Sequence, residues 1–235
     1  MYTLTKATGY PGYSREREIS QGKAIADTAV AADARYIIWS SIPSPAKISG
    51  GKLNKVDHFE SKYEVEQYIR TLPIKASFFV PGSFMQNYRR MMVPRPVGDG
   101  TYAISNVYEA STEIPLIDIE GDTGKWIAAI LANPDEYEGK VLCAATRLYT
   151  MQEAVDTISR VTGKTVVYKQ VPDEVFKGFL PQGFQEQYLQ MLQYVRGYGY
   201  YGAEQRKLVE WAAEQAKGKL TTFEEWLQRN PLNLQ

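Results

Sequence analysis

The chain has few of the features that would assign it to a broad functional class. Among its 235 residues Cys143 is the only cysteine, so no internal disulfide can form. Lys+Arg and Asp+Glu number 27 each, and this balance predicts binding neither to nucleic acid nor to an anionic membrane surface. No apolar run approaches the roughly 18 residues of a membrane span. These absences favour a cytoplasmic protein.

Several kinds of catalytic site are also missing. The sequence has no cluster of histidine and cysteine at metal-ligand spacing, no nucleophile elbow and no P-loop. Its first residues lack the basic and long apolar segments of a signal peptide. His58 is the only histidine, so acid–base chemistry at neutral pH has a single obvious candidate.

Short apolar runs alternate with helical patterns in the first half of the chain. Strands are predicted at 35–39, 76–80 and 141–145, with short ones at 2–5 and 166–168 and several more within 101–119. Helices are predicted from about 14 to 33, 59 to 71, 122 to 133 and 150 to 162. This order predicts parallel βαβ units with right-handed crossovers. Beyond residue 172 four further helices are expected, at 173–180, 184–196, 203–217 and 222–229.

Small polar residues stand where two of the predicted strands end. The strand at 35–39 is followed by Ser40 and Ser41, and the strand at 76–80 by Pro81 and Gly82. The helix between them carries His58 and, four residues on and therefore on the same helix face, Lys62. In an open parallel sheet, ligands bind outside the carboxyl ends of the strands. We therefore predict a binding site at this edge.

Each of these residues also has a structural interpretation. The serines can cap or turn the chain at a strand end, a lone histidine can be structural, and Lys62 can be a solvated helix residue. A stretch rich in aromatic residues and methionine follows at 84–92. It can form either a core helix or an adaptable apolar wall for a flat substrate.

The order of several motifs resembles the NmrA-like family of atypical short-chain dehydrogenases/reductases. The matching segments are Gln21-Gly22-Lys23 with Ala26-Asp27, Tyr36 to Ser41, His58 to Lys62, Val80 to Asn87, Gly124-Lys125-Trp126 with Asn133-Pro134, and Leu148-Tyr149-Thr150 with Thr162-Gly163-Lys164. The resemblance implies a doubly wound Rossmann sheet, a small helical C-terminal domain and a site for NADP or NAD between them. It implies a remainder of the Rossmann-like domain at 1–120 and a mainly helical substrate or partner region at 121–235, which includes short strands that return to the sheet.

The family's N-terminal βαβαβ half, with its glycine-rich turn, has no counterpart here, and Met1 falls at what resembles the fourth strand. None of the predicted strand-to-helix turns carries a G-x-G-x-x-G or G-x-x-G-x-x-G phosphate-binding turn. The segment Gly9-Tyr10-Pro11-Gly12 is no substitute, because proline removes an amide donor. We therefore expect an α/β fold: a truncated Rossmann-like parallel sheet with helices on its faces and a smaller, mostly helical C-terminal region.

The resemblance also implies roles for individual residues. The family's Tyr-x-x-x-Lys pair corresponds to His58 and Lys62, and its carbonyl-orienting serine to the Ser40-Ser41 pair. The predicted catalytic residues are His58, Lys62 and Ser41. The predicted cofactor-binding residues are Thr5, Lys6, Ser40, Lys62, Pro81, Gly82, Ser83 and Phe84. The predicted substrate-binding residues are Phe84, Met85, Tyr88 and Tyr194.

Three functions follow as hypotheses. The first is an NAD(P)-binding-type protein, either a redox-sensing regulator, which could be nuclear, or an oxidoreductase relative with an impaired cofactor site. The second is a cofactor-independent cyclase or isomerase of fungal-type secondary metabolism that uses an aromatic pocket with His58 and Lys62. The third is an inert fragment or interaction module. The expected partners are a small-molecule substrate or a regulatory protein. We also expect a homodimer that covers an exposed edge or face of the sheet.

Overall fold

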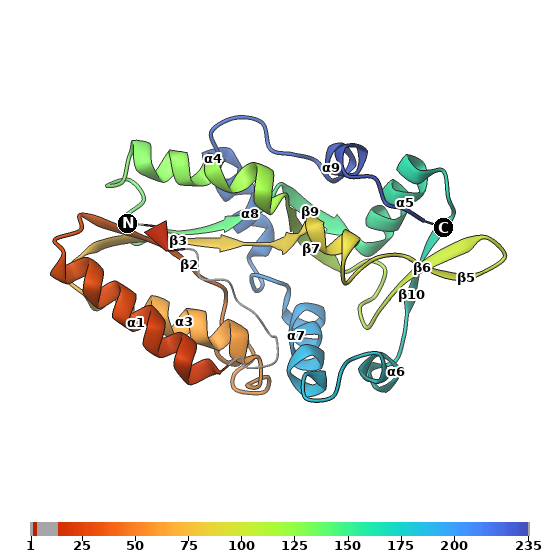
Figure 1. Cartoon of the computed structure of the whole chain (residues 1–235), viewed down its shortest axis with the longest axis horizontal. Helices are drawn as coiled ribbons and strands as arrows, with labels where there is room; N and C mark the ends of the chain where they lie inside the picture. Colours follow the sequence, from red (N-terminus) through yellow and green to blue (C-terminus); the bar gives the residue numbers. More distant parts are fainter. Residues whose placement is uncertain (1, 4–13, 235) are drawn as a thin grey trace.

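A computed structural model describes residues 2–3 and 14–234 of the chain. Its main sheet has four parallel strands in the order β1-β2-β3-β8 (Figure 1). The strands are β1 (Tyr2–Thr3), β2 (Tyr36–Ser40), β3 (Lys75–Pro81) and β8 (Val141–Ala144). The three longer strands lie within one residue of their predicted bounds, because each is a buried apolar run. The predicted α/β fold with a parallel sheet is confirmed.

Helices cover the two faces of this sheet. Helices α1 (Arg15–Ala31) and α3 (Asp57–Ile69) pack on the face that carries Trp39 and Phe78. Helix α4 (Ile119–Ala132) packs on the opposite face, against Ile38 and Phe79. This division follows from the two-residue period of a strand, which sends neighbouring side chains to opposite faces. Gly22 brings α1 close to α3, since a Cβ there would lie 2.6 Å from Val65 Cγ2.

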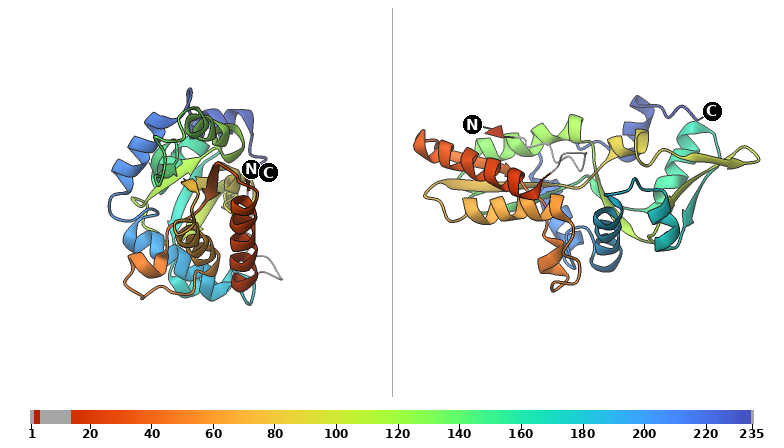
Figure 2. Two further views of the ribbon diagram at one scale, coloured as in Figure 1. Left: turned by 90° about the vertical axis from the view of Figure 1, so that its left-hand side faces the viewer. Right: turned by 60° about the horizontal axis from the view of Figure 1, so that its bottom comes forward.

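The remaining strands form two smaller sheets beyond the carboxyl end of β3. One contains β4 (Ser83–Phe84), β7 (Glu113–Ile117) and β9 (Arg147–Thr150), in the order β4-β7-β9. The other contains β5 (Arg95–Gly98), β6 (Thr101–Asn106) and β10 (Val166–Gln170), in the order β10-β6-β5. The antiparallel pair β5–β6 extends beyond the rest of the molecule in both Figure 1 and Figure 2.

The last third of the chain is mainly helical, as expected. Its helices are α5 (Met151–Thr162), α6 (Asp173–Gly178), α7 (Gln185–Tyr198), α8 (Gln205–Gln215) and α9 (Phe223–Arg229). Capping boxes start α5 at Thr150 and α9 at Thr222, and Gly163 ends α5 in the left-handed region at φ 67°. Two short elements complete the fold: α2 (Pro45–Ile48) and the 3₁₀ helix η1 (Met85–Arg89).

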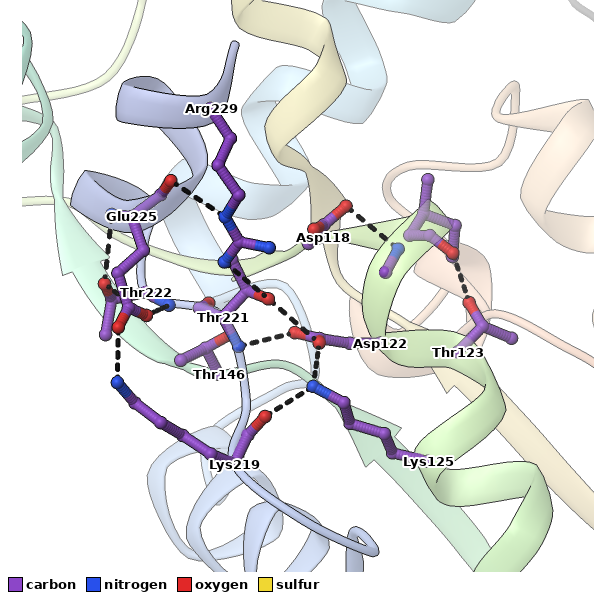
Figure 3. Close-up of polar contacts among 12 residues, drawn as sticks. Asp118, Asp122, Thr123, Lys125, Thr146, Lys219, Thr221, Thr222, Glu225 and Arg229 are labelled. Carbon is purple, nitrogen blue, oxygen red and sulfur yellow. Dashed lines mark hydrogen bonds and ion pairs between the residues drawn. The ribbon is translucent and has the colours of Figure 1, made fainter.

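The start of α4 differs from its predicted position. The helix begins at Ile119 and not at Asp122, because the Asp118 carboxylate accepts a hydrogen bond from the Gly121 amide at 3.1 Å and forms the N-cap. Asp122 is fully buried instead. Its carboxylate accepts hydrogen bonds from the Thr221 amide at 2.8 Å and from Lys125 Nζ at 2.6 Å (Figure 3). These bonds hold the segment between α8 and α9 against α4.

The two predicted parts of the chain are interleaved. Strand β8, from the second part, pairs with β3 of the first, in line with the expected return of short strands to the sheet. The division at residue 120 itself stays a prediction. Within residues 2–3 and 14–234, no helix is both long and apolar enough to cross a membrane.

Candidate functional site

The carboxyl ends of β2, β3 and β8 lie side by side at one edge of the sheet. The Ser41 amide donates to the Phe79 carbonyl at 2.9 Å, and the Gly82 amide donates to the Ala144 carbonyl at 2.9 Å. Helix α3 begins near the same edge, because it follows β2 in a βαβ unit. The structure therefore brings the serines at the end of β2, the Pro81-Gly82 turn at the end of β3 and the first two turns of α3 to one edge, as predicted.

Lys62 is buried and paired with a residue that the motifs did not point to. Its side chain is 7% exposed, and Nζ lies 2.5 Å from the Glu18 carboxylate of α1. The other Glu18 oxygen accepts a hydrogen bond from Ser61 Oγ at 2.5 Å. Burial lowers the pKa of Lys62, while the bond to Glu18 opposes this shift. The amine that the family resemblance assigns to a ribose is thus engaged by an internal carboxylate.

His58 lies one helical turn before Lys62 and is held in its neutral form. Burial lowers its pKa from 6.5 to about 4, and the positive charge of Lys62 adds to this shift. Its Nδ1 atom is buried and has no hydrogen-bond partner among the described residues. Its ring packs edge-on against Phe59, with centroids 4.8 Å apart. His58 is therefore a poor proton donor at neutral pH.

Ser41 provides a second unsatisfied polar atom at this edge. The residue is 1% exposed, and its Oγ has no hydrogen-bond partner within the described part of the chain. The loop that follows is held by the buried Glu60, whose carboxylate accepts from Ser44 Oγ at 2.8 Å and from the Ala46 amide at 2.8 Å. A buried hydroxyl without a partner is costly in free energy, and a ligand can satisfy it.

The turn after β3 leaves no space for side chains larger than glycine at its centre. A Cβ on Gly82 would lie 2.5 Å from the carbonyl oxygen of Pro115 in β7. Two tyrosine hydroxyls donate to carbonyls just before this turn: Tyr201 to Val80 at 2.9 Å and Tyr200 to Pro81 at 3.4 Å. The loop between α7 and α8 therefore packs on the predicted nicotinamide turn.

The predicted substrate residues lie mostly in the core. Met85 and Tyr194 are 0% exposed and Tyr88 is 1% exposed, whereas Phe84 is 37% exposed. The Tyr88 ring packs against Phe223 of α9, with centroids 4.6 Å apart. The stretch after β3 thus follows its structural interpretation as core, although as a 3₁₀ turn and not as a longer helix.

The other predicted site residues lie either at the same edge or outside the described part of the chain. Ser40 and Ser83 are half-buried at the carboxyl edge. Thr5 and Lys6 lie outside the described residues. A hollow of about 760 Å³ on the described surface runs along α1 and is lined by none of the predicted catalytic residues. No group of histidine, cysteine and carboxylate side chains suited to a metal ion occurs among the described residues.

A glycine pattern occurs outside the predicted strand-to-helix turns. The segment Gly197-Tyr198-Gly199-Tyr200-Tyr201-Gly202 has the spacing G-x-G-x-x-G. It follows helix α7 and does not connect a strand to a helix, and Gly199 adopts φ 76° as the C-cap of α7. Tyr200 and Tyr201 fill the space beside β3. The pattern therefore forms a helix end and not a phosphate-binding turn.

The donor groups at the edge suit only one end of a dinucleotide. Unsatisfied atoms on Ser41 and His58, together with the turn at Gly82, could border a nicotinamide or its ribose. The described strand-to-helix turns contain no glycine-rich amide cradle for a pyrophosphate. The residues that the structure describes thus fit the nicotinamide end and do not account for the adenosine end.

Comparisons with known proteins agree with this architecture. The sequence profile of the NmrA-like family matches residues 3–227. An NmrA-like family domain-containing protein of Dictyostelium discoideum is 28% identical over 97% of this chain and 74% of its own length. The NmrA-like family domain-containing oxidoreductase FrzB of Cladobotryum is 29% identical over 66% of this chain, which spans 50% of FrzB.

The fold is also similar to solved structures. The crystal structure of NmrA, a negative transcriptional regulator, in complex with NADP, superposes with a TM-score of 0.74. The two chains are 22% identical over 92% of this chain and 70% of the other. A regulator thus appears among the similar structures and an oxidoreductase among the related sequences, and the NmrA crystal structure contains the dinucleotide.

Proposed function

Because the chain belongs to the NmrA-like family, we propose that it is a regulatory protein that binds NADP or NAD and does not transfer hydride. The observation that carries this proposal is the buried ion pair between Lys62 and Glu18, at 2.5 Å. In the short-chain dehydrogenase pattern, the corresponding lysine holds the ribose and assists a proton donor. Here a carboxylate of the same chain already occupies the amine.

The state of His58 supports the same reading. With a pKa of about 4, only about one molecule in a thousand carries the protonated imidazole at pH 7. A reductase that adds hydride to a carbonyl also needs a proton for the resulting oxyanion. His58 does not supply one readily at neutral pH, and the Lys62 ammonium is engaged by Glu18. Binding without turnover is consistent with this arrangement.

The competing functions have less support. The similarity to FrzB keeps an oxidoreductase role as the second candidate. A cyclase or isomerase would require an open aromatic pocket, whereas Met85, Tyr88 and Tyr194 are packed into the core. A regulatory protein partner and a homodimer belong to the proposal as well.

Trp39 offers a direct test of binding. Its indole Nε1 donates to the main-chain carbonyl of Lys62 at 3.1 Å, so we expect its fluorescence to change when this part of α3 shifts. We would titrate the protein with NADPH, NADH and reduced nicotinamide mononucleotide, and follow tryptophan emission. Trp39→Phe is the control that assigns the signal, because Trp126, Trp211 and Trp226 remain.

The expected result is a saturable change that Trp39→Phe abolishes, with no loss of NADPH absorbance when quinone or aldehyde acceptors are added. Catalytic NADPH oxidation that Lys62→Met reduces would contradict the proposal and support the oxidoreductase. Absence of any saturable signal, confirmed by calorimetry, would refute dinucleotide binding.

A further inference from the structure

The arginines of this protein differ in whether their guanidinium groups have a hydrogen-bond or ion-pair partner. All twelve lie in the described part of the chain. Six pair with carboxylates: Arg15, Arg70, Arg147, Arg160, Arg196 and Arg206. Arg229 donates to Thr221 and to a carbonyl of α9. The five others have no guanidinium partner among the described residues, and three of these five fall within Arg89–Arg95.

These three residues belong to one exposed surface segment, which we call the arginine strip (residues 89–97). Arg89 ends η1, Arg90 follows it, and Arg95 begins β5. All three are exposed. Strand β5 is exposed along its whole length and forms the end of the β10-β6-β5 sheet. The strip thus runs from the body of the molecule onto the projecting β5–β6 pair (Figure 1).

Large apolar side chains are exposed within the same strip. Met91 is 62% exposed and Val97 is 44% exposed. Arg95 and Val97 both lie in β5, whose four residues are all exposed. Arginine and methionine are enriched at protein interfaces, where both offer large contact areas.

We propose that the arginine strip is a docking surface for an acidic segment of another protein, with carboxylates and apolar side chains interleaved. Arginine guanidinium groups bind carboxylates through paired hydrogen bonds, which gives such a segment a fixed position. Charge complementarity selects this partner, because no carboxylate of the described residues neutralises the strip. The inference relies on the proposed regulatory function for its biological role but not for its chemistry.

A nucleic acid fits the strip less well. The whole chain has no net charge, so it generates no long-range attraction for a polyanion. Residues 89–97 contain no aromatic side chain on which a base could stack. Met91 and Val97 instead offer contacts for aliphatic side chains.

The test is fluorescence anisotropy with a labelled peptide of about 12 residues that repeats Glu-Glu-Leu, compared with a Lys-Lys-Leu peptide of equal length. We expect saturable binding of the acidic peptide alone, weakened as salt rises from about 0.05 to about 0.5 M. Arg89→Glu with Arg95→Glu should weaken binding about tenfold. Met91→Ser should weaken it several-fold without any change of charge.

The matched control is Arg17→Glu with Arg35→Glu, which reverses the same number of exposed, unpaired arginines elsewhere. This control should bind the peptide as the unmodified protein does. Equal loss in the two double variants, no saturable peptide binding, or tighter binding of a single-stranded oligonucleotide of equal length would overturn the proposal. Circular dichroism checks that each variant is folded.

The peptide titration needs no dinucleotide, so its outcome is separate from that of the NADPH titration. If the dinucleotide proposal fails and this one holds, the peptide still binds while the Trp39 signal is absent. If this one fails alone, Arg89→Glu with Arg95→Glu keeps the Trp39 response and the acidic peptide does not bind.

Discussion

Replacing Lys62 by methionine should destabilise the protein markedly. The substitution keeps the length and most of the apolar stem of the side chain but removes the ammonium. The Glu18 carboxylate, 13% exposed, then keeps only Ser61 as a side-chain donor among the described residues. Removing one partner of a buried ion pair costs about 3–5 kcal/mol, because it leaves an uncompensated charge.

The residual exposure of both side chains places the expected loss at about 3 kcal/mol. Glu18→Gln should cost less, because the amide oxygen can still accept from Lys62 or Ser61. For a chain of this size each 1 kcal/mol shifts Tm by about 2–4 °C, so Lys62→Met should lower Tm by roughly 6–12 °C. The measurement is the free energy of unfolding in urea, followed by tryptophan fluorescence.

The double variant Glu18→Met with Lys62→Met tests the reasoning. Exchanging a buried ion pair for apolar side chains is often nearly neutral, so the double variant should be more stable than Lys62→Met alone. The controls are Lys23→Met and Glu64→Gln, which break a solvent-accessible pair that Arg15 also joins, and each should cost less than about 1 kcal/mol. A loss below about 1 kcal/mol for Lys62→Met, or losses that simply add in the double variant, would refute a desolvated pair.

Three further predictions concern this edge and the buried contacts of Asp122. Because burial depresses the pKa of His58 from 6.5 to about 4, the unfolded chain binds the extra proton between these values. Stability should therefore fall by up to about 3 kcal/mol as pH drops from 6.5 to 4, and His58→Gln should flatten this dependence in urea titrations. Gly82→Ala should cost about 1–3 kcal/mol, because its Cβ would lie 2.5 Å from the Pro115 carbonyl oxygen of β7. Gly124→Ala, where a Cβ inside α4 meets open space, should be neutral or stabilising by up to about 1 kcal/mol. Thermal unfolding of the two variants makes the comparison. Asp122→Ala removes the buried carboxylate that binds the Thr221 amide and Lys125, so it should lower the free energy of unfolding by about 2–4 kcal/mol and expose the segment before α9 to limited proteolysis. The control Asp135→Ala removes only an exposed ion pair and should change neither stability nor proteolysis.

Local patterns in the sequence determined most of the architecture. Period-two and period-3.6 spacing located the longer strands and helices, and the capping boxes at Thr150 and Thr222 marked helix starts, because these signals depend on neighbouring residues alone. The placement of Ser41, Pro81 and Lys62 at one edge also followed from the sequence. Parallel strands joined by right-handed crossovers put their carboxyl ends together whatever the packing details.

Only the tertiary structure decided which partners the side chains at that edge have and how deeply they are buried. Glu18 and Lys62 are 44 residues apart, and their contact depends on how α1 packs across α3 at Gly22. Asp122 and Thr221 are 99 residues apart, so no local signal showed that Asp122 is buried against Thr221 and is not the N-cap of α4. The burial of Tyr88 likewise required α9 to fold back over η1. Charge pairing and burial are set by non-local packing, and for this reason the sequence predicted where the site lies but not that its lysine is already engaged.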